Sequence, residues 1–273
     1  RVRPSQEVTN FDLPAFVCPH ECVGQLQDAL RVPSGAQEPL LAGTGRVWSD
    51  NDPDARRRRL AAACQAVSGA LWRPSVRATV EGTRMLRWCD GSEYDPGQRG
   101  VTKVIFEEGL AMDVALRAMA EHPAARVAVV SAASAYQLGG GVLTGGRHVL
   151  EEALCMQTTL YASLARAKEL ARQKDLRDAH GQNIHIPEDG CVVHPDVEVL
   201  RAGTDTGYAL LDTPRTLCAV ISMAMPNKNY RLVGYDSISG PKYKNVVQSK
   251  FGAALRAAIS CSVDMLVIPD CGC

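Results

Sequence analysis

The sequence predicts an α/β protein in which helices and strands form layers around a largely parallel or mixed sheet. Two observations lead to this prediction. Apolar runs at residues 126–130, 217–223 and 263–268 are too continuous to alternate with polar residues, as is usual for strands buried in parallel sheets. Between these runs, apolar residues recur at the spacing of three and four that favours helices. Strands that alternate with helices are typical of layered α/β domains.

The N-terminal part of the chain is interpreted as an irregular arm followed by a helix. Residues 1 to about 50 are rich in proline, glycine and polar residues, with one short helical stretch near residues 21–30. Pro53 follows two aspartates, as expected in the first turn of a helix, and the apolar spacing then predicts a helix over residues 54–71. The basic run at residues 56–59 is either a solvated helix face or a contact for a phosphate or a partner.

The rest of the chain has a more regular pattern. The predicted elements are a charged, turn-rich link at 82–100 with Trp88 and Cys89, a strand at 101–106, a helix at 109–121, a strand at 126–130, a long helix at 151–174, strand-like residues at 191–199 broken by Pro195, a strand at 217–223, a helix at 243–260 and a strand at 263–268. The expected inward side chains are Leu110, Val114 and Leu116 in the first of these helices, and Val246, Val247, Phe251, Leu255 and Ile259 in the last.

The charge balance argues against a protein that its overall field draws to nucleic acid or to membranes. Lysine plus arginine number 30, and aspartate plus glutamate also number 30. No apolar run is long enough for a membrane span, and the start of the sequence lacks the apolar core of a signal peptide. We therefore expect an intracellular protein, cytoplasmic or nuclear, with no direct nucleic-acid or membrane partner.

The ten cysteines are scattered along the chain and are interpreted mainly as free thiols in a reducing compartment. Cys18 and Cys22 flank His20, but no second couplet follows at metal-finger spacing. A zinc site that combines these three residues with a distant ligand is the weaker alternative. We predict neither a metal nor a cofactor.

A glycine triplet before two acidic residues has the clearest chemical content. Gly139, Gly140 and Gly141 follow a β-branched run, and Glu151 and Glu152 lie in the first turn of the next predicted helix. Glycine lets the backbone approach a ligand closely, and a helix start beside it suits an anion such as phosphate. Two adjacent carboxylates repel one another, so one can hold a raised pKa and act as an acid. The simpler alternatives are a flexible turn and acidic residues favoured by the helix dipole.

Three stretches of interest each follow a predicted strand, at residues 131–141, 225–227 and 269–273. In α/β sheets, ligands bind at the carboxyl ends of the strands. We therefore expect the three stretches to contribute to one site.

The order of these motifs resembles a known family. Residues 131–134, with the glycine triplet after them, are similar to the ADP-ribose-binding loop of macrodomains, with Ser131 and Ser134 in place of two asparagines. The triplet and the glutamate pair are similar to the signature of poly(ADP-ribose) glycohydrolases, with Leu150 in place of a glutamine. The likeness to the microbial branch of that family spans roughly residues 101–273 and includes the segments 151–155, 159–161, 194–197, 225–227 and 267–273.

The resemblance implies a macrodomain-like three-layer α/β/α fold with a mixed central sheet, preceded by a helical and irregular accessory region. The implied boundaries are residues 1–98 for the accessory region and 99–273 for the catalytic domain. The implied function is a hydrolase that binds ADP-ribose and cleaves ADP-ribosyl O-glycosidic bonds. Its partner would be ADP-ribose or an ADP-ribosylated protein.

The resemblance also implies the roles of individual residues. Glu152 would protonate the leaving oxygen and then activate water, while Glu151 would orient the ribose hydroxyls. Backbone N–H groups of the glycine loop would contact ribose and phosphate, and the terminal loop would replace a glycine-rich diphosphate loop. The implied ligand-binding residues are Ser131, Ser134, Gly139, Gly140, Gly141, Val142, Asn227, Cys271 and Gly272. We also expect the native chain to continue past Cys273, since a ligand loop would otherwise be frayed.

Departures from the family pattern leave two alternatives open. Leu150, Ser131 and Ser134 all replace amide side chains of that pattern. A hydrolase of single ADP-ribosyl units on protein, for example on arginine, would share the fold. A non-catalytic ADP-ribose reader would keep the pocket without the chemistry. The retained pair Glu151 and Glu152 favours the enzyme.

Overall fold

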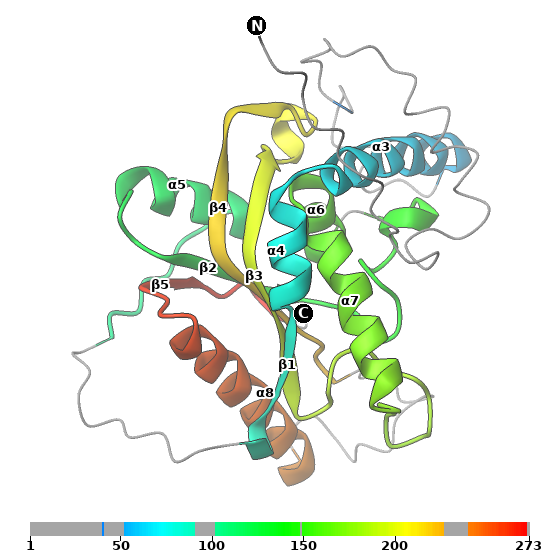
Figure 1. Cartoon of the computed structure of the whole chain (residues 1–273), viewed down its shortest axis with the longest axis vertical. Helices are drawn as coiled ribbons and strands as arrows, with labels where there is room; N and C mark the ends of the chain where they lie inside the picture. Colours follow the sequence, from blue (N-terminus) through cyan, green and yellow to red (C-terminus); the bar gives the residue numbers. More distant parts are fainter. Residues whose placement is uncertain (1–39, 41–51, 91–101, 148, 227–239, 272–273) are drawn as a thin grey trace, which may run out of the picture.

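The computed structural model describes residues 40, 52–90, 102–147, 149–226 and 240–271 (Figure 1). Within them, five strands form one sheet in the order β1-β3-β4-β2-β5. β2 runs parallel to β4 and β5, whereas β3 is antiparallel to β4 and to β1, so the predicted mixed sheet is confirmed. The strands are β1 (Arg84–Arg87), β2 (Val127–Ala132), β3 (Gly190–Arg201), β4 (Leu210–Met223) and β5 (Met265–Val267).

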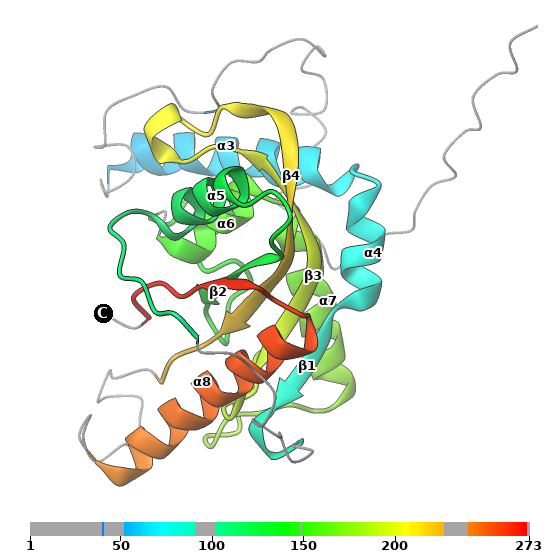
Figure 2. The ribbon, with the colours of Figure 1, turned by 90° about the vertical axis from the view of Figure 1, so that its left-hand side faces the viewer.

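Helices cover both faces of the sheet, which confirms the predicted three-layer arrangement. Side chains of β2 alternate between two cores: Val127 and Val129 join the core with α3, α5, α6 and α7, while Ala128 and Val130 join the core with α8. Figure 2 shows α5 and α8 on opposite sides of β2 and β5. The helices are α3 (Pro53–Leu71), α4 (Ser75–Gly82), α5 (Ala111–Glu121), α6 (Leu150–Gln157), α7 (Leu160–Gln173) and α8 (Pro241–Ser260), with short 3-10 turns η1 (Trp88–Asp90), η2 (Val142–Thr144) and η3 (Thr204–Thr206).

The helix predicted from residue 54 is confirmed as α3. Asp52 caps its N-terminus, with Oδ2 accepting hydrogen bonds from the N–H groups of Asp54 and Ala55 at 3.1 and 3.0 Å. Pro53 occupies the first turn, where its missing N–H costs nothing. The arm before it and the Cys18, His20 and Cys22 cluster lie outside the described residues.

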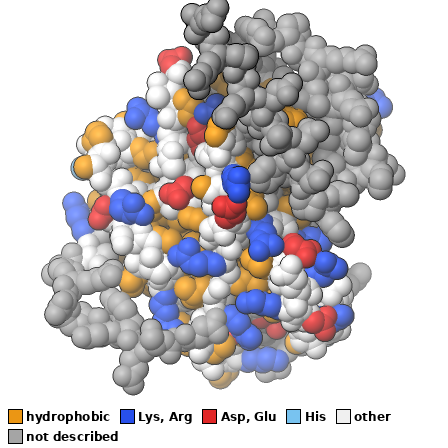
Figure 3. All heavy atoms as spheres, in the orientation of Figure 1, with side chains coloured by type: hydrophobic (Ala, Val, Ile, Leu, Met, Phe, Trp, Pro, Cys, Tyr) orange, Lys and Arg blue, Asp and Glu red, His pale blue; other side chains and the backbone are white. Residues whose placement is uncertain are grey.

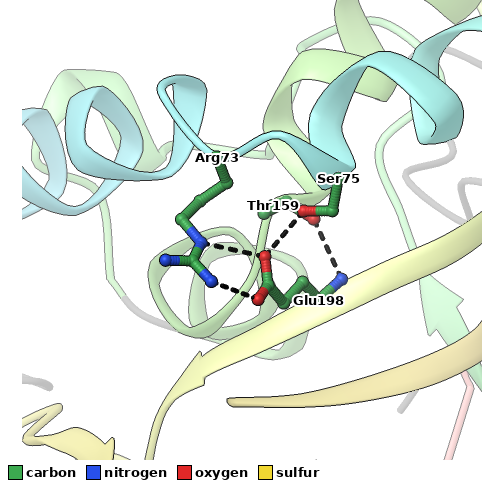
Figure 4. Close-up of polar contacts among 4 residues, drawn as sticks. All are labelled: Arg73, Ser75, Thr159 and Glu198. Atoms are coloured by element: carbon green, nitrogen blue, oxygen red, sulfur yellow. Dashed lines mark hydrogen bonds and ion pairs between the residues drawn. The ribbon is translucent and has the colours of Figure 1, made fainter. Parts of the chain in front are cut away.

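Residues 53–90 pack directly against the sheet. β1 is an edge strand on β3, and Trp88 lies against α8, where the Arg256 guanidinium sits 4.0 Å from its ring centroid. A further contact joins the start of α4 to β3 through Arg73, Ser75 and Glu198 (Figure 4). The division of the chain at residue 98 stays a prediction, and so does the separate role of the first region.

Two sequence predictions in this part of the chain are wrong. The link at 82–100 contains strand β1, which the turn-rich composition concealed. The strand predicted at 101–106 does not form over residues 102–106, where Val104, Ile105 and Phe106 are exposed. An apolar, β-branched run makes a strand only where a sheet edge accepts it.

The helix predicted at 151–174 is two helices, α6 and α7. The break falls at Thr158 and Thr159, whose backbone pairs with β3: Thr158 bridges to Val199, and the Thr159 N–H donates to the carbonyl of Glu198 at 3.0 Å. Pairing with the strand therefore replaces continued helix at these β-branched residues.

Three further predictions need correction. β3 continues through Pro195, which keeps its place opposite Ala219, while the neighbouring Asp196 takes a positive φ of 50°. Among the residues predicted to face inward, Leu116 in α5 and Phe251 in α8 do pack against the two cores, but the fully buried positions of both helices are mainly alanines, which let a helix approach the sheet closely. Leu110 and Leu255 are about half exposed, and the buried residues are Ala111, Met112, Ala115, Ala118 and Met119 in α5 and Lys250, Ala253, Ala254, Ala257 and Ala258 in α8.

Candidate active site

The glycine triplet forms a tight loop between β2 and α6. Gly139 and Gly140 have φ angles of +62° and +60°, in the left-handed region that favours glycine. A Cβ atom at Gly140 would overlap the carboxylate of Glu152 and lie 2.8 Å from its Cδ. One at Gly139 would lie 2.7 Å from Cγ1 of Val142. Gly140 is therefore needed for close packing against Glu152 and Gly139 for close packing against Val142, so the alternative of a merely flexible turn is wrong.

Glu151 is held from both sides by the loop. Its Oε2 accepts a hydrogen bond from the N–H of Ser134 at 2.7 Å, and its Oε1 accepts one from the N–H of Gly139 at 3.1 Å. The side chain is only 2% exposed. Glu151 thus fixes the shape of the loop on either side of residues 135–138.

Glu152 points to a different part of the loop. Its Oε1 accepts a hydrogen bond from the N–H of Gly141 at 2.7 Å. Its Oε2 is buried and has no hydrogen-bond partner within the described part of the chain. Side chains at adjacent helix positions diverge by about 100°, so the two carboxylates occupy different places. Glu152 keeps one oxygen available for another molecule, whereas both oxygens of Glu151 are engaged.

Burial raises the pKa of both carboxyl groups. For Glu151 the pKa rises to about 8, mainly because burial disfavours the charge and partly because Glu152 adds its own, against the N–H groups of Ser134 and Gly139. Burial also raises the pKa of Glu152, and the Gly141 N–H opposes this rise. Each group can therefore hold a proton nearer to neutral pH than an exposed glutamate can.

Two arginines of α3 hold the far end of the loop. Arg59 is 2% exposed, and its Nε donates to the carbonyls of Gly145 and Gly146 at 3.1 and 2.9 Å. Arg56 Nε donates to the carbonyl of Thr144 at 2.8 Å. Of these two arginines, Arg56 is exposed, as a solvated face predicts, whereas Arg59 is buried, and the alternative of a phosphate or partner contact stays a prediction. Their spacing of three places both on one helix face, a signal the sequence contained.

The loop N–H groups are engaged within the protein. Gly139 and Gly141 donate to the glutamates, Gly140 donates to the carbonyl of Gln137 at 3.2 Å, and Val142 donates to that of Gly139 at 3.0 Å. A ligand would therefore have to exchange with these bonds or approach the glycine Cα atoms. The predicted direct contact from these N–H groups stays a prediction.

The other predicted ligand residues are only partly brought together. Ser131 lies at the end of β2, and its buried Oγ has no partner within the described residues. Ser134 turns inward instead, with Oγ accepting from the N–H groups of Tyr136 and Gln137. Cys271 packs beside the core on the α8 side. Asn227 and Gly272 lie outside the described residues.

The predicted convergence of three stretches agrees with the sheet topology. β2, β4 and β5 are parallel, so the segments that follow them leave the sheet at the same edge. Ser131, Met225 and Cys271 mark these three ends among the described residues.

Tyr208 is fully buried in the same core as Leu154 and Cys155 of α6, which no sequence motif indicated. Its pKa is raised mainly by burial, and the charge of Glu152 adds to the rise. Tyr208 lies on the connection between β3 and β4, far from the motif in sequence. Tyr161 belongs to the core, where its Cδ2 would lie 3.3 Å from a Cβ atom added at Gly139.

A buried acid with a free oxygen, beside a second carboxyl that shapes a glycine loop, suits cleavage of a glycosidic bond. The described residues contain no cluster of three or more potential metal-ligating side chains. Among the described helices, not one combines the length and the apolar character of a bilayer span.

The comparison with protein families confirms the family. Residues 66–202 match the model of the microbial-type PARG catalytic domain, and the chain belongs to this family. It is accordingly a hydrolase of ADP-ribosyl glycosidic bonds. The matched range begins within α3 and contains the glycine loop, the glutamate pair and β3.

Solved structures agree with this assignment. The poly(ADP-ribose) glycohydrolase of Thermomonospora curvata has 25% sequence identity over 78% of each chain, with a TM-score of 0.58. Its structure bound to the inhibitor ADP-HPD has 25% identity over 78% of this chain and 77% of that one, with a TM-score of 0.58. The search of curated proteins returned no match.

Proposed function

We propose that the enzyme releases ADP-ribose from poly(ADP-ribose), with Glu152 as the catalytic acid and base and Glu151 as a positioning residue. The observation that carries the proposal is the unpaired, buried Oε2 of Glu152 beside the glycine loop. A carboxyl oxygen without a protein partner, in a site of this family, is suited to bond the leaving oxygen of the substrate.

The reaction follows from this placement. Glu152, protonated on Oε2, gives its proton to the glycosidic oxygen as the bond from the ribose anomeric carbon to that oxygen breaks. The ribose develops positive charge, which the carboxylate formed on Glu152 stabilises. A water then attacks the anomeric carbon and gives a proton to Glu152, which restores the acid. The burial that raises the pKa of Glu152 keeps the proton available for the first step.

Glu151 acts through the loop. Its bonds to Ser134 and Gly139 hold the backbone that faces the substrate. Gly140 lets the loop lie against Glu152, where a Cβ atom would collide with the carboxylate. The buried Oγ of Ser131, at the carboxyl end of β2, is a further group suited to the ligand.

The similar enzyme of Thermomonospora curvata is a poly(ADP-ribose) glycohydrolase, and this supports a polymer as the substrate. The test uses four separate substrates: the polymer, and single ADP-ribose units linked to arginine, serine and glutamate. Release of free ADP-ribose is measured at equal ADP-ribose content. We expect the polymer to be cleaved fastest. If a single-unit substrate releases ADP-ribose faster than the polymer does, that substrate and not the polymer would be assigned to the enzyme. Release from none of the four would contradict the proposal.

A further inference from the structure

A cavity of about 340 Å³ lies beside the candidate active site, between α7 and the segment 175–185. Tyr136 and Leu138 of the glycine loop form one wall. α7 forms the opposite wall, where Ala162 and Ala165 leave the space that larger side chains would fill. The volume is in the range of small-ligand pockets, which is roughly 300–1,000 Å³. No step of the proposed hydrolysis uses this cavity.

Basic side chains outnumber acidic ones around the cavity. Glu169 and Asp175 also line it, but each is paired, with Arg172 at 3.0 Å and Arg177 at 2.8 Å. The remaining cations of the lining, Arg166 and Lys168, have no ion pair or hydrogen bond among the described residues. Figure 3 shows basic side chains gathered over α4 and α7, with acidic ones between them. The rim of the cavity therefore favours an anion.

His185 adds an independent observation. It lines the cavity and is 2% exposed, and its Nε2 has no hydrogen-bond partner in the described part of the chain. Its backbone N–H donates a hydrogen bond to the carbonyl of Ala135 at 2.9 Å. This bond holds His185 next to Tyr136, which also lines the cavity. Buried polar atoms nearly always have a partner, so an unpaired ring nitrogen in a cavity wall indicates a polar atom of a ligand.

We propose that this cavity is a second ligand site that binds a purine nucleoside monophosphate. The base stacks on Tyr136 above the alanine face of α7, its polar edge bonds Nε2 of His185, and the phosphate lies near Arg166 and Lys168. A planar ring with a polar edge and an anionic end matches all three features of the lining. The ligand comes either from free nucleotide or from the adenosine phosphate part of a neighbouring unit in a polymer.

The test titrates AMP into the full chain by calorimetry. The double variant Arg166→Ala/Lys168→Ala removes the unpaired cations, and Ala165→Phe fills the cavity. Lys174→Ala is the matched control, because this exposed lysine ends α7 outside the lining. We expect AMP affinity to fall at least tenfold in the double variant and in Ala165→Phe, and less than twofold in Lys174→Ala. On the same samples, thermal melts report folding, and release of ADP-ribose at saturating polymer reports the proposed hydrolysis.

A second arm identifies the source of the nucleotide. If the site holds a neighbouring polymer unit, the cavity variants raise KM for long polymer and leave KM for the single-unit substrate unchanged. If only AMP affinity changes, the ligand is free nucleotide. No AMP binding at millimolar concentration, or equal AMP affinity in the wild type and the double variant, would overturn the second site even where hydrolysis is intact.

Discussion

Two buried carboxylate sites in this protein differ in their partners rather than in their burial. Glu151 and Glu152 at the start of α6 are 2% and 6% exposed, and Glu198 in β3 is 9% exposed. The first pair meets mainly backbone N–H groups, and burial raises the pKa of both. Glu198 meets the guanidinium of Arg73, whose hydrogen bonds are the largest cause of its lowered pKa. A charged partner favours the ionised carboxylate. Backbone N–H groups alone do not outweigh burial, so these carboxyl groups keep a proton closer to neutral pH.

The two sites also differ in how many carboxylate oxygens of Glu198 and of Glu152 have hydrogen-bond partners. Glu198 Oε1 pairs with Arg73 at 2.5 Å, and its Oε2 accepts from Arg73 and from Ser75 at 3.0 and 2.6 Å (Figure 4). Thr159 completes this contact, with Oγ1 accepting from the Glu198 N–H at 3.0 Å. Glu152 keeps one oxygen unpaired among the described residues. We infer that the first arrangement holds the fold together and that the second performs chemistry.

The largest effect is expected on turnover, when one carboxyl group is substituted at each of the two sites. Glu152→Gln keeps the shape and removes the titrating proton, so turnover should fall by at least roughly 10²-fold while ADP-ribose still binds. Glu198→Gln is the matched control and should keep turnover within about threefold of the wild type. Steady-state release of ADP-ribose, with calorimetry for binding, measures both. Hydrolysis by Glu152→Gln at the wild-type rate would remove the proposed role.

The second prediction tests the close packing of the glycine loop. Gly140→Ala brings a Cβ atom against the Glu152 carboxylate, so it should lower turnover by roughly tenfold or more and destabilise the fold. Gly181→Ala is the control, because Gly181 also has a positive φ, of +78°, but no atom within 4 Å of the added Cβ. Both should lose about 1 kcal/mol to backbone strain, and only Gly140→Ala should lose activity. Equal loss of activity in both would refute the packing argument.

The third prediction weakens the structural site. Arg73→Ala leaves Glu198 with Ser75 as its remaining side-chain donor among those described. We expect a loss of about 1 kcal/mol in the free energy of unfolding, because the arginine is partly exposed and solvent screens the pair. KM and kcat should stay close to wild type. Denaturant unfolding provides the measurement, and Arg77→Ala, which breaks the exposed pair with Glu81, is a control that should change stability less. An effect no larger than that of Arg77→Ala would show that the Glu198 contact is not a brace.

Local patterns predicted the elements and the motif but not the contacts that join distant segments. The apolar run of β2 and the capped start of α3 are decided by nearby residues, and both were predicted correctly. The glutamate pair could be placed beside the glycines because a short connection separates them in sequence. The break between α6 and α7 could not be predicted, since it depends on pairing between Thr158 and a strand about 40 residues later.

The same limit applies to the candidate site. The Arg59 contacts with Gly145 and Gly146 span more than 80 residues in sequence, so the basic run alone suggested only a solvated face or a phosphate contact. Tyr208, on the connection between β3 and β4, joins the core beside α6 although no local motif marks it. The inward faces of α5 and α8 were only partly predicted, for a related reason. Hydrophobic spacing favours large side chains, but α8 approaches the sheet through Ala253, Ala254 and Ala257.

The smallest expected effect is the opposite pH dependence of the two sites. The folded-state pKa of Glu151, about 8, lies above the ordinary glutamate value of 4.5, so its contribution to stability is fully present below about pH 4.5 and is lost as the pH rises through 8. The folded-state pKa of Glu198 is lowered, so its contribution to stability is present above pH 4.5 and is lost as the pH falls through its folded pKa.

The melting temperature of Glu151→Gln should therefore fall less with rising pH than that of the wild type between pH 5 and about 8.5. This variant should also be less stable at pH 5, because one amide oxygen cannot replace both acceptors for Ser134 and Gly139. Glu198→Gln, in contrast, should flatten the acid limb only. Thermal melts of the three proteins from about pH 3 to about pH 8.5 cover both limbs and compare the slopes directly. A Glu151→Gln curve parallel to the wild type above pH 6 would show that the carboxyl is ionised in the fold and that burial does not hold its proton.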